Sequence, residues 1–572
     1  MVLRRHHLAL GAALCLTAPL LAAWSSNARN QSTTSAASVV VALPVQTSPN
    51  WFFPVLSASA YTDTNTQMYD LMYMPLVYFN NKDEADYSQS LASSIVSNAT
   101  GSVYTIHLNP KWHWSNGAPV TAQDVVFTWD IMKAASGNGN LPWVYGGAGT
   151  GGMPNDLKSV VATSKYTVTI TLNITANPNW FIHNDIGQFV IVPKASWNRY
   201  PSNMQKELTW IKSIANDPTA QPYHVVDGPY KFSSYTPNEE WIFTPNPSFD
   251  GHKSSIGRLI FQYQTSTSSE FAALRSGTVQ VGYLPPAMWS VRKDLTGDKY
   301  WPSYLFGFNM MRLDENPGAE DGMGSVFSQA YVRQAMEMGI DQPAIISGIY
   351  HGQGIIEDSP VPSEPKTVFD DPALNKQLYP FNIKAGQKLL ESHGWRLVHG
   401  VMTKGKQKFE FPLIYSSGDP AVQDTVELLQ RDWAKEGIKI SLVSMPFDNL
   451  VTTDHGKPSG WDAAYWGAGW TYEPDFYPTG GALFKTGAAS NAGGYSNPTM
   501  NKLIEDTYLP ATAAQSQKAL FAYEAYAAKQ VPYLWFPWLA TLNESSTALK
   551  GVESTFNPIE DLYMPNYWTV KK

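Results

Sequence analysis

The sequence predicts a mixed α/β protein, because segments with strand periodicity and segments with helical periodicity follow one another along the chain. Tyr104–Leu108 and Thr167–Leu172 alternate apolar and polar residues with a period of two, as half-buried strands do. A helical pattern that begins at Thr121 separates them. In the second half, a helical segment ends at Gly437 and runs directly into the strand pattern Ile438–Leu442.

The elements expected in the first half begin with a short buried strand at Ser38–Leu43, which is almost entirely apolar. The best helical signal of the chain follows Thr121, where Asp124 three residues later completes a capping pattern. The apolar residues of that helix fall on one face; they are Ala122, Val125, Val126, Trp129 and Met132.

The second half contains further helices with recognisable ends. One is expected from about Gln329 to Gly339, and Asp341 is placed to cap the next. Others are expected at Ile383–Ser392, ending near Gly394, and at Ala421–Glu436. A last helix, Ala511–Gln530, precedes the apolar, aromatic strand Tyr533–Phe536.

Composition excludes several classes of protein. The 572 residues include 40 Lys and Arg against 48 Asp and Glu, a formal net charge of −8, and only 15% of residues are charged. An acidic chain without a basic block is a poor binder of phosphate backbones, so nucleic acid is excluded as a partner. A hydrophobic content of 43% excludes a disordered chain. Aromatic residues are abundant at 13%.

The N-terminus is typical of an export signal. Arg4 and Arg5 precede an apolar run, Leu8–Ala23, and the small residues around Ala28 offer a cleavage site. We therefore expect a signal peptide over residues 1–28 and a flexible tether over 29–37, with the protein in the periplasm or at the outer face of the cytoplasmic membrane. Trp24 stands where a lipoprotein would carry its cysteine, and the only cysteine, Cys15, lies inside the apolar run. Disulfides and thiolate metal sites are thus not expected in the mature chain.

The densest cluster of aromatic and acidic residues is Trp466–Tyr477, which contains Glu473-Pro474-Asp475. Two acids among aromatic residues suit a glycosidase, and they suit a binding cleft equally well. Acids this close around a proline usually point apart, so binding is the favoured interpretation and an exported hydrolase that uses Glu473 and Asp475 is the alternative. A third interpretation makes Trp466 and Trp470 ordinary core residues.

Other motifs give no site. Gly147–Gly152 formally matches G-x-G-x-x-G, but Pro154 follows it and no strand–turn–helix pattern surrounds it. Pro110 separates His107 from His113, and Gly394 separates His393 from His399. Neither pair of histidines is therefore expected to share the face of a helix. We therefore predict neither a cofactor nor a metal.

Five ordered segments resemble one family. Tyr104–Phe127 is similar to the signature of the family 5 extracellular solute-binding proteins, the oligopeptide-, dipeptide- and nickel-binding subunits of ATP-driven importers. The other four resembling segments follow in the family's order; they are Asp227–Phe232, Ala272–Gly277, Tyr331–Ala335 with Asp341, and Gly493–Pro498.

The resemblance implies a clamp of two lobes with an extra domain. Lobe I would comprise residues 38–70, 193–303 and 532–572, the extra domain residues 71–192, and lobe II residues 304–531. The chain would cross between the lobes near Phe308-Asn309 and near Val531-Pro532. The resemblance also implies a monomer, not an enzyme, that closes on a solute and meets the permease subunits of an ABC importer in the membrane.

The resemblance also locates the site. In peptide-binding relatives, the segment similar to Ala468–Trp470 continues through an Asp that meets the peptide's amino group, and that Asp has no clear counterpart here. The ligand is therefore expected to be peptide-like, a sugar, a nickel chelate or another small solute. Phe52 and Phe53 occupy the region that lines the cleft in relatives, with core packing as an equal alternative. The predicted ligand-binding residues are Trp466, Trp470, Thr471, Tyr472, Glu473, Asp475, Phe52, Phe53 and Asn309.

Overall fold

A computed structural model describes residues 37–45, 47–137, 140–319, 322–374, 376–455, 460–488 and 490–571, which belong to one compact unit. The predicted export signal, most of the tether and Cys15 lie outside these residues. Within the described ranges, no helix is both long and apolar enough to cross a membrane.

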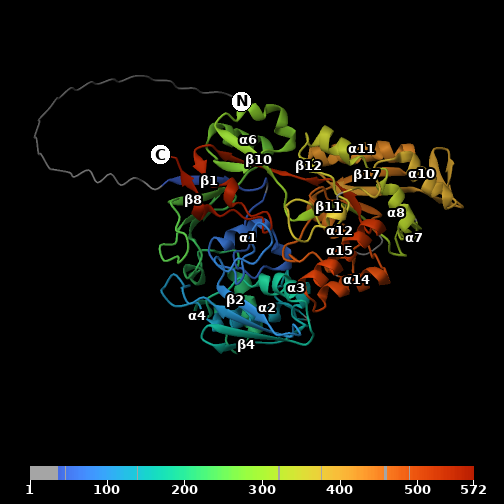
Figure 1. Cartoon of the computed structure of the whole chain (residues 1–572). Coiled ribbons are helices and arrows are strands. Elements are labelled where there is room, and N and C mark those ends of the chain that lie inside the picture. Colours follow the sequence, from blue (N-terminus) through green and yellow to red (C-terminus); the bar gives the residue numbers. More distant parts are fainter. Residues whose placement is uncertain are drawn as a thin grey trace, which may run out of the picture. The chain divides into compact units, whose positions relative to one another are not determined.

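The first large sheet contains strands from both ends of the chain (Figure 1). Its seven strands are ordered β10-β22-β9-β1-β8-β7-β6. The predicted first strand is confirmed as β1, which pairs in parallel with β8 and β9. The strands span β1 Ser38–Ala42, β6 Tyr230–Thr236, β7 Glu240–Pro245, β8 Arg258–Gln262, β9 Val281–Tyr283, β10 Asp298–Ser303 and β22 Thr541–Ser546.

The second large sheet is ordered β17-β16-β18-β11-β19, and β20 also pairs with β11. Its central strand β11 is buried along its whole length. The predicted helix–glycine–strand unit is confirmed, because α11 ends at Gly437, whose φ of 94° is left-handed, and leads into β17. The strands span β11 Gly307–Leu313, β16 Glu410–Ser416, β17 Lys439–Met445, β18 Ala463–Tyr465, β19 Trp470–Thr471 and β20 Leu534–Phe536.

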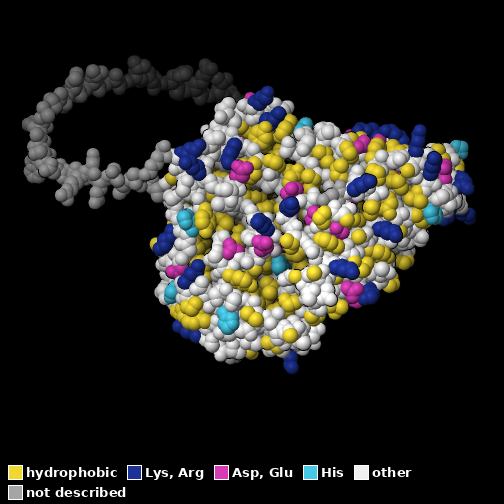
Figure 2. All heavy atoms as spheres, viewed as in Figure 1, with side chains coloured by type: hydrophobic (Ala, Val, Ile, Leu, Met, Phe, Trp, Pro, Cys, Tyr) yellow, Lys and Arg dark blue, Asp and Glu magenta, His cyan; other side chains and the backbone are white. Residues whose placement is uncertain are grey.

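Several helices lie beside this second sheet (Figure 1). Lys and Arg side chains gather on the surface over two of them, α10 and α11 (Figure 2). The predicted helix Ile383–Ser392 is confirmed as α10. The helices of this half are α7 Met323–Phe327, α8 Ala330–Glu337, α9 Gln342–Ala344, α10 Ile383–Ser392, α11 Pro420–Glu436, α12 Phe447–Asp454, α13 Gly481–Phe484, α14 Pro498–Tyr508 and α15 Ala513–Gln530.

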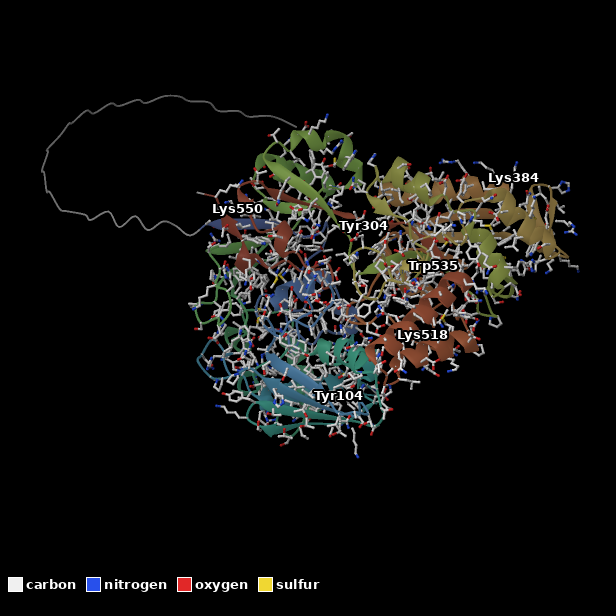
Figure 3. All side chains as sticks on the ribbon, viewed as in Figure 1. Tyr104, Tyr304, Lys384, Lys518, Trp535 and Lys550 are labelled. Atoms are coloured by element: carbon white, nitrogen blue, oxygen red, sulfur yellow. The ribbon has the colours of Figure 1, made fainter. Side chains whose placement is uncertain are left out.

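A third, antiparallel sheet of four strands, ordered β2-β3-β5-β4, lies within the range expected for the extra domain, where Figure 3 labels Tyr104. The capping pattern is confirmed: the backbone N–H and the hydroxyl of Thr121 each donate to Asp124 Oδ2 at 2.8 Å. The elements of this part and of the first lobe are β2 Ala92–Ser97, β3 Val103–Leu108, β4 Leu157–Ser164, β5 Thr167–Leu172, α1 Asp63–Asp70, α2 Ala122–Ala135, α3 Pro178–Asn184, α4 Lys194–Trp197, α5 Met204–Ile214 and α6 Thr267–Ser276.

The Arg-Gln-Ala segment of α8 has a clear structural role, because it satisfies the C-terminus of α15. Arg333 Nε donates to the carbonyl of Val531 at 2.8 Å, and its Nη2 donates to that of Gln530 at 3.0 Å. Gln334 Nε2 donates to the carbonyl of Lys529 at 2.9 Å. Carbonyls at a helix C-terminus have no partner within the helix, so these side chains replace the missing donors. They also hold Val531 at a φ of 48°, a left-handed conformation that is costly for a β-branched residue.

The chain crosses between the two large sheets twice. The first crossing, Tyr304–Phe306, connects β10 to β11, and Figure 3 labels Tyr304 there. The second runs through Pro537–Ala540, between β20 and β22. The expected boundary at Val531-Pro532 is therefore wrong: β20 belongs to the second sheet, where Phe536 pairs with Asn309. Phe308 and Asn309 likewise lie inside β11, just beyond the first crossing.

Candidate ligand-binding site

A cavity of about 680 Å³ lies between the two large sheets, close to the crossings. The first sheet contributes Val41 of β1 and Tyr283 of β9 to its lining. The second contributes Asn309 of β11 and Trp470 of β19, and Trp538 of the second crossing closes part of the wall. A ligand in this cavity would therefore contact both lobes at once.

The second lobe supplies an indole that a buried charge network holds in place. Trp466 Nε1 donates to Asp454 Oδ2 at 2.7 Å, and the guanidinium of Arg312 lies 4.1 Å from the centre of the Trp466 ring. Arg312 and Asp454 are completely buried and form an ion pair at 3.3 Å. Nδ1 of His455 lies 2.7 Å from the other oxygen of Asp454. Cation–π contact and the hydrogen bond together fix the Trp466 ring in the cavity wall.

Trp470 and Thr471 reach the cavity because β19 pairs with β11 at Phe308 and Gly307. The approach is so close that a Cβ on Gly307 would lie 2.0 Å from the carbonyl oxygen of Trp470. Gly469 adopts a φ of 78°, and a Cβ there would lie 2.4 Å from the carbonyl oxygen of Phe308. Both positions therefore require glycine if Trp470 is to stand where it does.

The first lobe supplies carboxyl groups. Asp63, the first residue of α1, and Asp561, at a φ of 49°, line the cavity together with Glu473. Asp63 is open to the cavity, but protein surrounds it on the other sides. Burial raises the pKa of Asp63, and burial followed by repulsion from Asp63 raises that of Asp561. Asp63 lies close enough to Asp561 for its charge to oppose the ionisation of Asp561.

Glu473 is the carboxyl that the second lobe adds to this group. Its burial, and after that the neighbouring carboxylates Asp63, Asp70, Glu560 and Asp561, raise its pKa well above the usual range. No Lys, Arg or His occurs among the described residues that line the cavity. The site is thus strongly acidic and has aromatic walls.

Five of the predicted residues line this cavity together: Asn309, Trp466, Trp470, Thr471 and Glu473. Asn309 is almost fully buried, and its Nδ2 donates to the Tyr465 hydroxyl and the Pro537 carbonyl, each at 3.2 Å. Its side chain therefore connects β11 to the second crossing.

The other four predicted residues lie elsewhere, which corrects the prediction. Tyr472 points away from its neighbours Thr471 and Glu473, as alternation along an extended segment requires, and its hydroxyl donates to the Pro360 carbonyl at 2.5 Å. Phe52 and Phe53 are fully buried core residues. The ring centre of Phe53 lies 4.6 Å from that of Trp197, and the ring centre of Phe52 lies 5.8 Å from that of Phe232.

Asp475 lies in a contact between the segment after β19 and helix α3, which ends at Asn184. It accepts a hydrogen bond from Asn184 Nδ2, and burial raises its pKa to about 7. Asn184 also makes two hydrogen bonds to the backbone of Tyr477. Its Oδ1 accepts from the Tyr477 N–H at 2.7 Å, and its Nδ2 donates to the Tyr477 carbonyl at 3.0 Å. Nearby, Trp180 stacks on Tyr508 at 4.5 Å. Glu473 and Asp475 therefore do not face a common substrate, unlike a glycosidase pair.

Sequence reasoning missed the acidic residues of the first lobe, Asp63 and Asp561. Nothing in the local sequence distinguishes them from solvated acids, because only the fold brings α1 next to the C-terminal segment. Across the described part of the chain, no group of three or more His, Cys, Asp or Glu is arranged to hold a metal ion.

Comparison with known proteins relates this chain to one protein family. Residues 86–489 match the model of the bacterial extracellular solute-binding proteins, family 5. The chain is similar to the oligopeptide-binding protein AppA of Bacillus subtilis, with 21% identity over 91% of this chain and 90% of AppA. It is also similar to the periplasmic oligopeptide-binding protein OppA of Salmonella typhimurium, with 22% identity over 82% of each chain.

Solved structures share the fold. The Bacillus subtilis AppA complex with a nonapeptide matches with a TM-score of 0.74 and 20% identity, over 94% of this chain and 99% of that one. NikZ from Campylobacter jejuni, in complex with Ni(L-His), matches with a TM-score of 0.72 and 19% identity, over 93% and 99%. With the family model spanning most of its length, the chain belongs to the bacterial extracellular solute-binding proteins, family 5.

Proposed function

We propose that this protein captures a small organic or peptide-like solute in the cavity between its lobes and delivers it to the permease of an ABC importer. The observation that carries the proposal is the composition of the cavity wall, to which both large sheets contribute. Family membership supports the same role. We further infer that the protein is exported and acts as a monomer.

The cavity suggests how capture would couple to closure. Asp63, Asp561 and Tyr283 lie on the first-lobe side, whereas Trp466, Trp470 and Glu473 lie on the second. A solute that contacts both sets binds the closed form better than the open form, so it shifts the population toward closure. The permease would then recognise the closed arrangement of the two lobes.

The fold alone does not name the solute. Related structures carry a nonapeptide in AppA, Ni(L-His) in NikZ and the peptide STSA in DppA from Helicobacter pylori. A volume of about 680 Å³ is in the range of pockets for small organic ligands. The identity of the solute therefore depends on the side chains of this cavity rather than on the fold.

The direct test is ligand-dependent thermal stability. Purified protein would be melted with short peptides, with sugars and with nickel chelates, and any molecule that co-purifies would be identified by native mass spectrometry. A ligand at about 100 times its dissociation constant adds roughly 2.7 kcal/mol to the free energy of unfolding. Unchanged melting with every class, and no co-purified molecule, would contradict the receptor role.

The same preparation tests whether the protein acts by binding alone. We expect no turnover of chromogenic glycosides or peptides, because Glu473 and Asp475 lie on different surfaces of their segment. Turnover that is lost in Glu473→Gln would instead establish the exported hydrolase.

A further inference from the structure

We infer that a cavity beside α1 is a second ligand-binding site, which takes a small zwitterion whose ammonium and carboxylate lie at opposite ends of an apolar body. The cavity has a volume of about 260 Å³. Its described lining residues fall within 67–78, 88–112, 229–252 and 560–567, and none of them belongs to the second large sheet. The site is therefore distinct from the cavity between the two large sheets.

A hydrogen-bonded partition separates the two cavities. Gln67 and Tyr563, both buried, line each of them. The Tyr563 N–H donates to Gln67 Oε1 at 2.8 Å, and Gln67 Nε2 donates to the Tyr563 carbonyl at 3.2 Å. At its other end the second cavity is lined by the exposed residues Ser88, Lys111 and His252, which form its rim. A small solute can thus enter from solvent without passing between the large sheets.

Aromatic rings hold the two basic side chains of the rim. The Lys111 ammonium lies 4.2 Å from the Trp112 ring centre and donates to the Ser88 carbonyl at 3.3 Å. The imidazole of His252 stacks on the Tyr567 ring, with the ring centres 4.4 Å apart and an angle of 6° between the planes. Because these contacts already restrict both side chains, binding a carboxylate there costs less side-chain entropy.

Two carboxyl groups lie deeper in the same cavity. Asp70, the last residue of α1, and Glu560 are both half-buried. Glu560 accepts a hydrogen bond from the Phe79 N–H at 2.9 Å. Burial raises the pKa of Glu560 to about 8, and burial followed by repulsion from Glu560 raises the pKa of Asp70. The two carboxyls are therefore close together, and an ammonium group beside them would favour their ionised forms.

The basic rim and the acidic interior do not pair with each other. Among the described residues, no ion pair joins Lys111 or His252 to Asp70 or Glu560. A zwitterion that spans the cavity can meet both sets of charges at once. An ion of one sign would leave the other set without a partner, so the arrangement selects for a solute with both charges.

The rest of the wall suits a hydrocarbon body. The rings of Trp112 and Phe249 stack with their centres 5.8 Å apart, and Met74 and Met564 also line the cavity. Aromatic rings and thioether side chains pack well against methylene groups and adapt to their shape. The volume is slightly below the roughly 300–1,000 Å³ of pockets for drug-sized ligands, so we expect an occupant about as small as a single amino acid.

The test compares three probes that share one hydrocarbon chain. 6-Aminohexanoate carries both charges, hexylamine carries only the ammonium, and hexanoate carries only the carboxylate. Their affinities for the full chain would be measured by NMR titration at pH 8, because burial raises the pKa values of the two carboxyls. We expect 6-aminohexanoate to bind at least about 10-fold more tightly than either singly charged probe.

Two variants locate the two ends of the probe. Lys111→Met should weaken binding of 6-aminohexanoate about 10-fold and should not weaken binding of hexylamine, because it removes only a partner of the carboxylate. Glu560→Gln should weaken binding of both amines about 10-fold and should not weaken binding of hexanoate. Gln keeps an acceptor for the Phe79 N–H, and if this variant does not fold, the exposed Lys111 still provides the test.

Lys165→Met is the matched control for Lys111→Met. Lys165 is also exposed and lies 5.0 Å from the ring centre of Tyr166, but it does not line the cavity. This variant should keep the affinity of the unmodified protein for all three probes. A loss equal to that of Lys111→Met would show that the effect does not come from the cavity and would contradict the assignment.

Trp470→Ala separates this site from the cavity between the large sheets, whose wall contains Trp470. The variant should bind 6-aminohexanoate as tightly as the unmodified protein, and loss of binding would place the probe in the other cavity. The inference also fails if the three probes bind equally, if 6-aminohexanoate does not bind, or if Lys111→Met and Glu560→Gln lose no affinity. None of these outcomes bears on solute capture between the lobes, which is read from the co-purified molecule.

Discussion

The two walls of the cavity treat charge in opposite ways. On the second lobe, Arg312 and Asp454 are both fully buried and paired, and they hold the Trp466 ring between them. On the first lobe, Asp63 and Asp561 lie close together, and the described lining of the cavity contains no Lys, Arg or His to neutralise them. The charges of the second-lobe wall neutralise each other within the protein, whereas the first-lobe wall keeps negative charge that only protons or a ligand can neutralise. The difference separates residues that shape the cavity from residues that select its occupant.

The largest effect should come from breaking the paired wall. Asp454→Asn leaves the buried Arg312 guanidinium without its anion, and we expect a loss of about 3–5 kcal/mol in the free energy of unfolding, measured with urea. The double variant Arg312→Met with Asp454→Leu removes both charges and should lose much less. A loss below about 1 kcal/mol in the single variant would show that the pair does not support this wall.

The unpaired carboxyls predict a stability that falls as pH rises. Burial raises the pKa of Glu560 and of Glu544 to about 8, whereas both titrate near 4.3 in an unfolded chain. Between these limits the folded protein binds more protons than the unfolded chain, so stability is complete below about pH 4.3 and declines toward pH 8. These two shifts make the free energy of unfolding higher at pH 5 than at pH 8, by roughly 3–4 kcal/mol for each group that keeps its full shift. Equal or greater stability at pH 8 would contradict the assignment.

Trp470 separates a binding role from a core role. Its side chain is only partly buried, whereas its backbone pairs with β11 whatever the side chain. Trp470→Ala should therefore weaken binding of the co-purified solute about 10- to 30-fold, or about 1.4–2 kcal/mol, and leave the circular dichroism spectrum unchanged. Loss of the folded spectrum would support the core interpretation instead.

The smallest predicted effect is a gain. Asp561→Asn replaces one of the two neighbouring carboxyls, Asp63 and Asp561, by a neutral amide, and Asn tolerates the left-handed backbone of this position. We expect about 1 kcal/mol of added stability at pH 8 and a smaller gain at pH 5, because the raised pKa of Asp561 leaves less of the ionised form, which Asn removes, at the lower pH. Urea unfolding at both pH values measures it, and destabilisation at pH 8 would show that the pair is not under strain.

Local elements could be predicted from the sequence because their signals are local. The Thr121–Asp124 capping box, the helix Ile383–Ser392 and the glycine end at Gly437 all lie where the pattern places them. Tyr533–Phe536 was correctly predicted to contain a strand, yet its sheet could not be known. Its pairing with β11 depends on a contact with residues more than two hundred positions earlier.

The cavity could be predicted only on one side. Trp466, Trp470 and Glu473 are close in sequence, so their clustering is visible in the chain itself. Asp63 and Asp561 become neighbours only in the folded protein, and Phe52 and Phe53 satisfy the same apolar pattern whether they line a cavity or fill a core. Composition cannot distinguish these two outcomes, because burial depends on packing.

The contact between Asn184 and Tyr477 has a consequence for how affinity and selectivity divide between residues. Its hydrogen bonds join the segment after β19 to the end of α3, and neither residue lines the cavity. If the contact exists only in the binding-competent form, it favours that form equally for every solute and multiplies all affinities by one factor. Changes at Asn184 would therefore alter how strongly the receptor binds, and changes in the acidic wall would alter which solute it prefers.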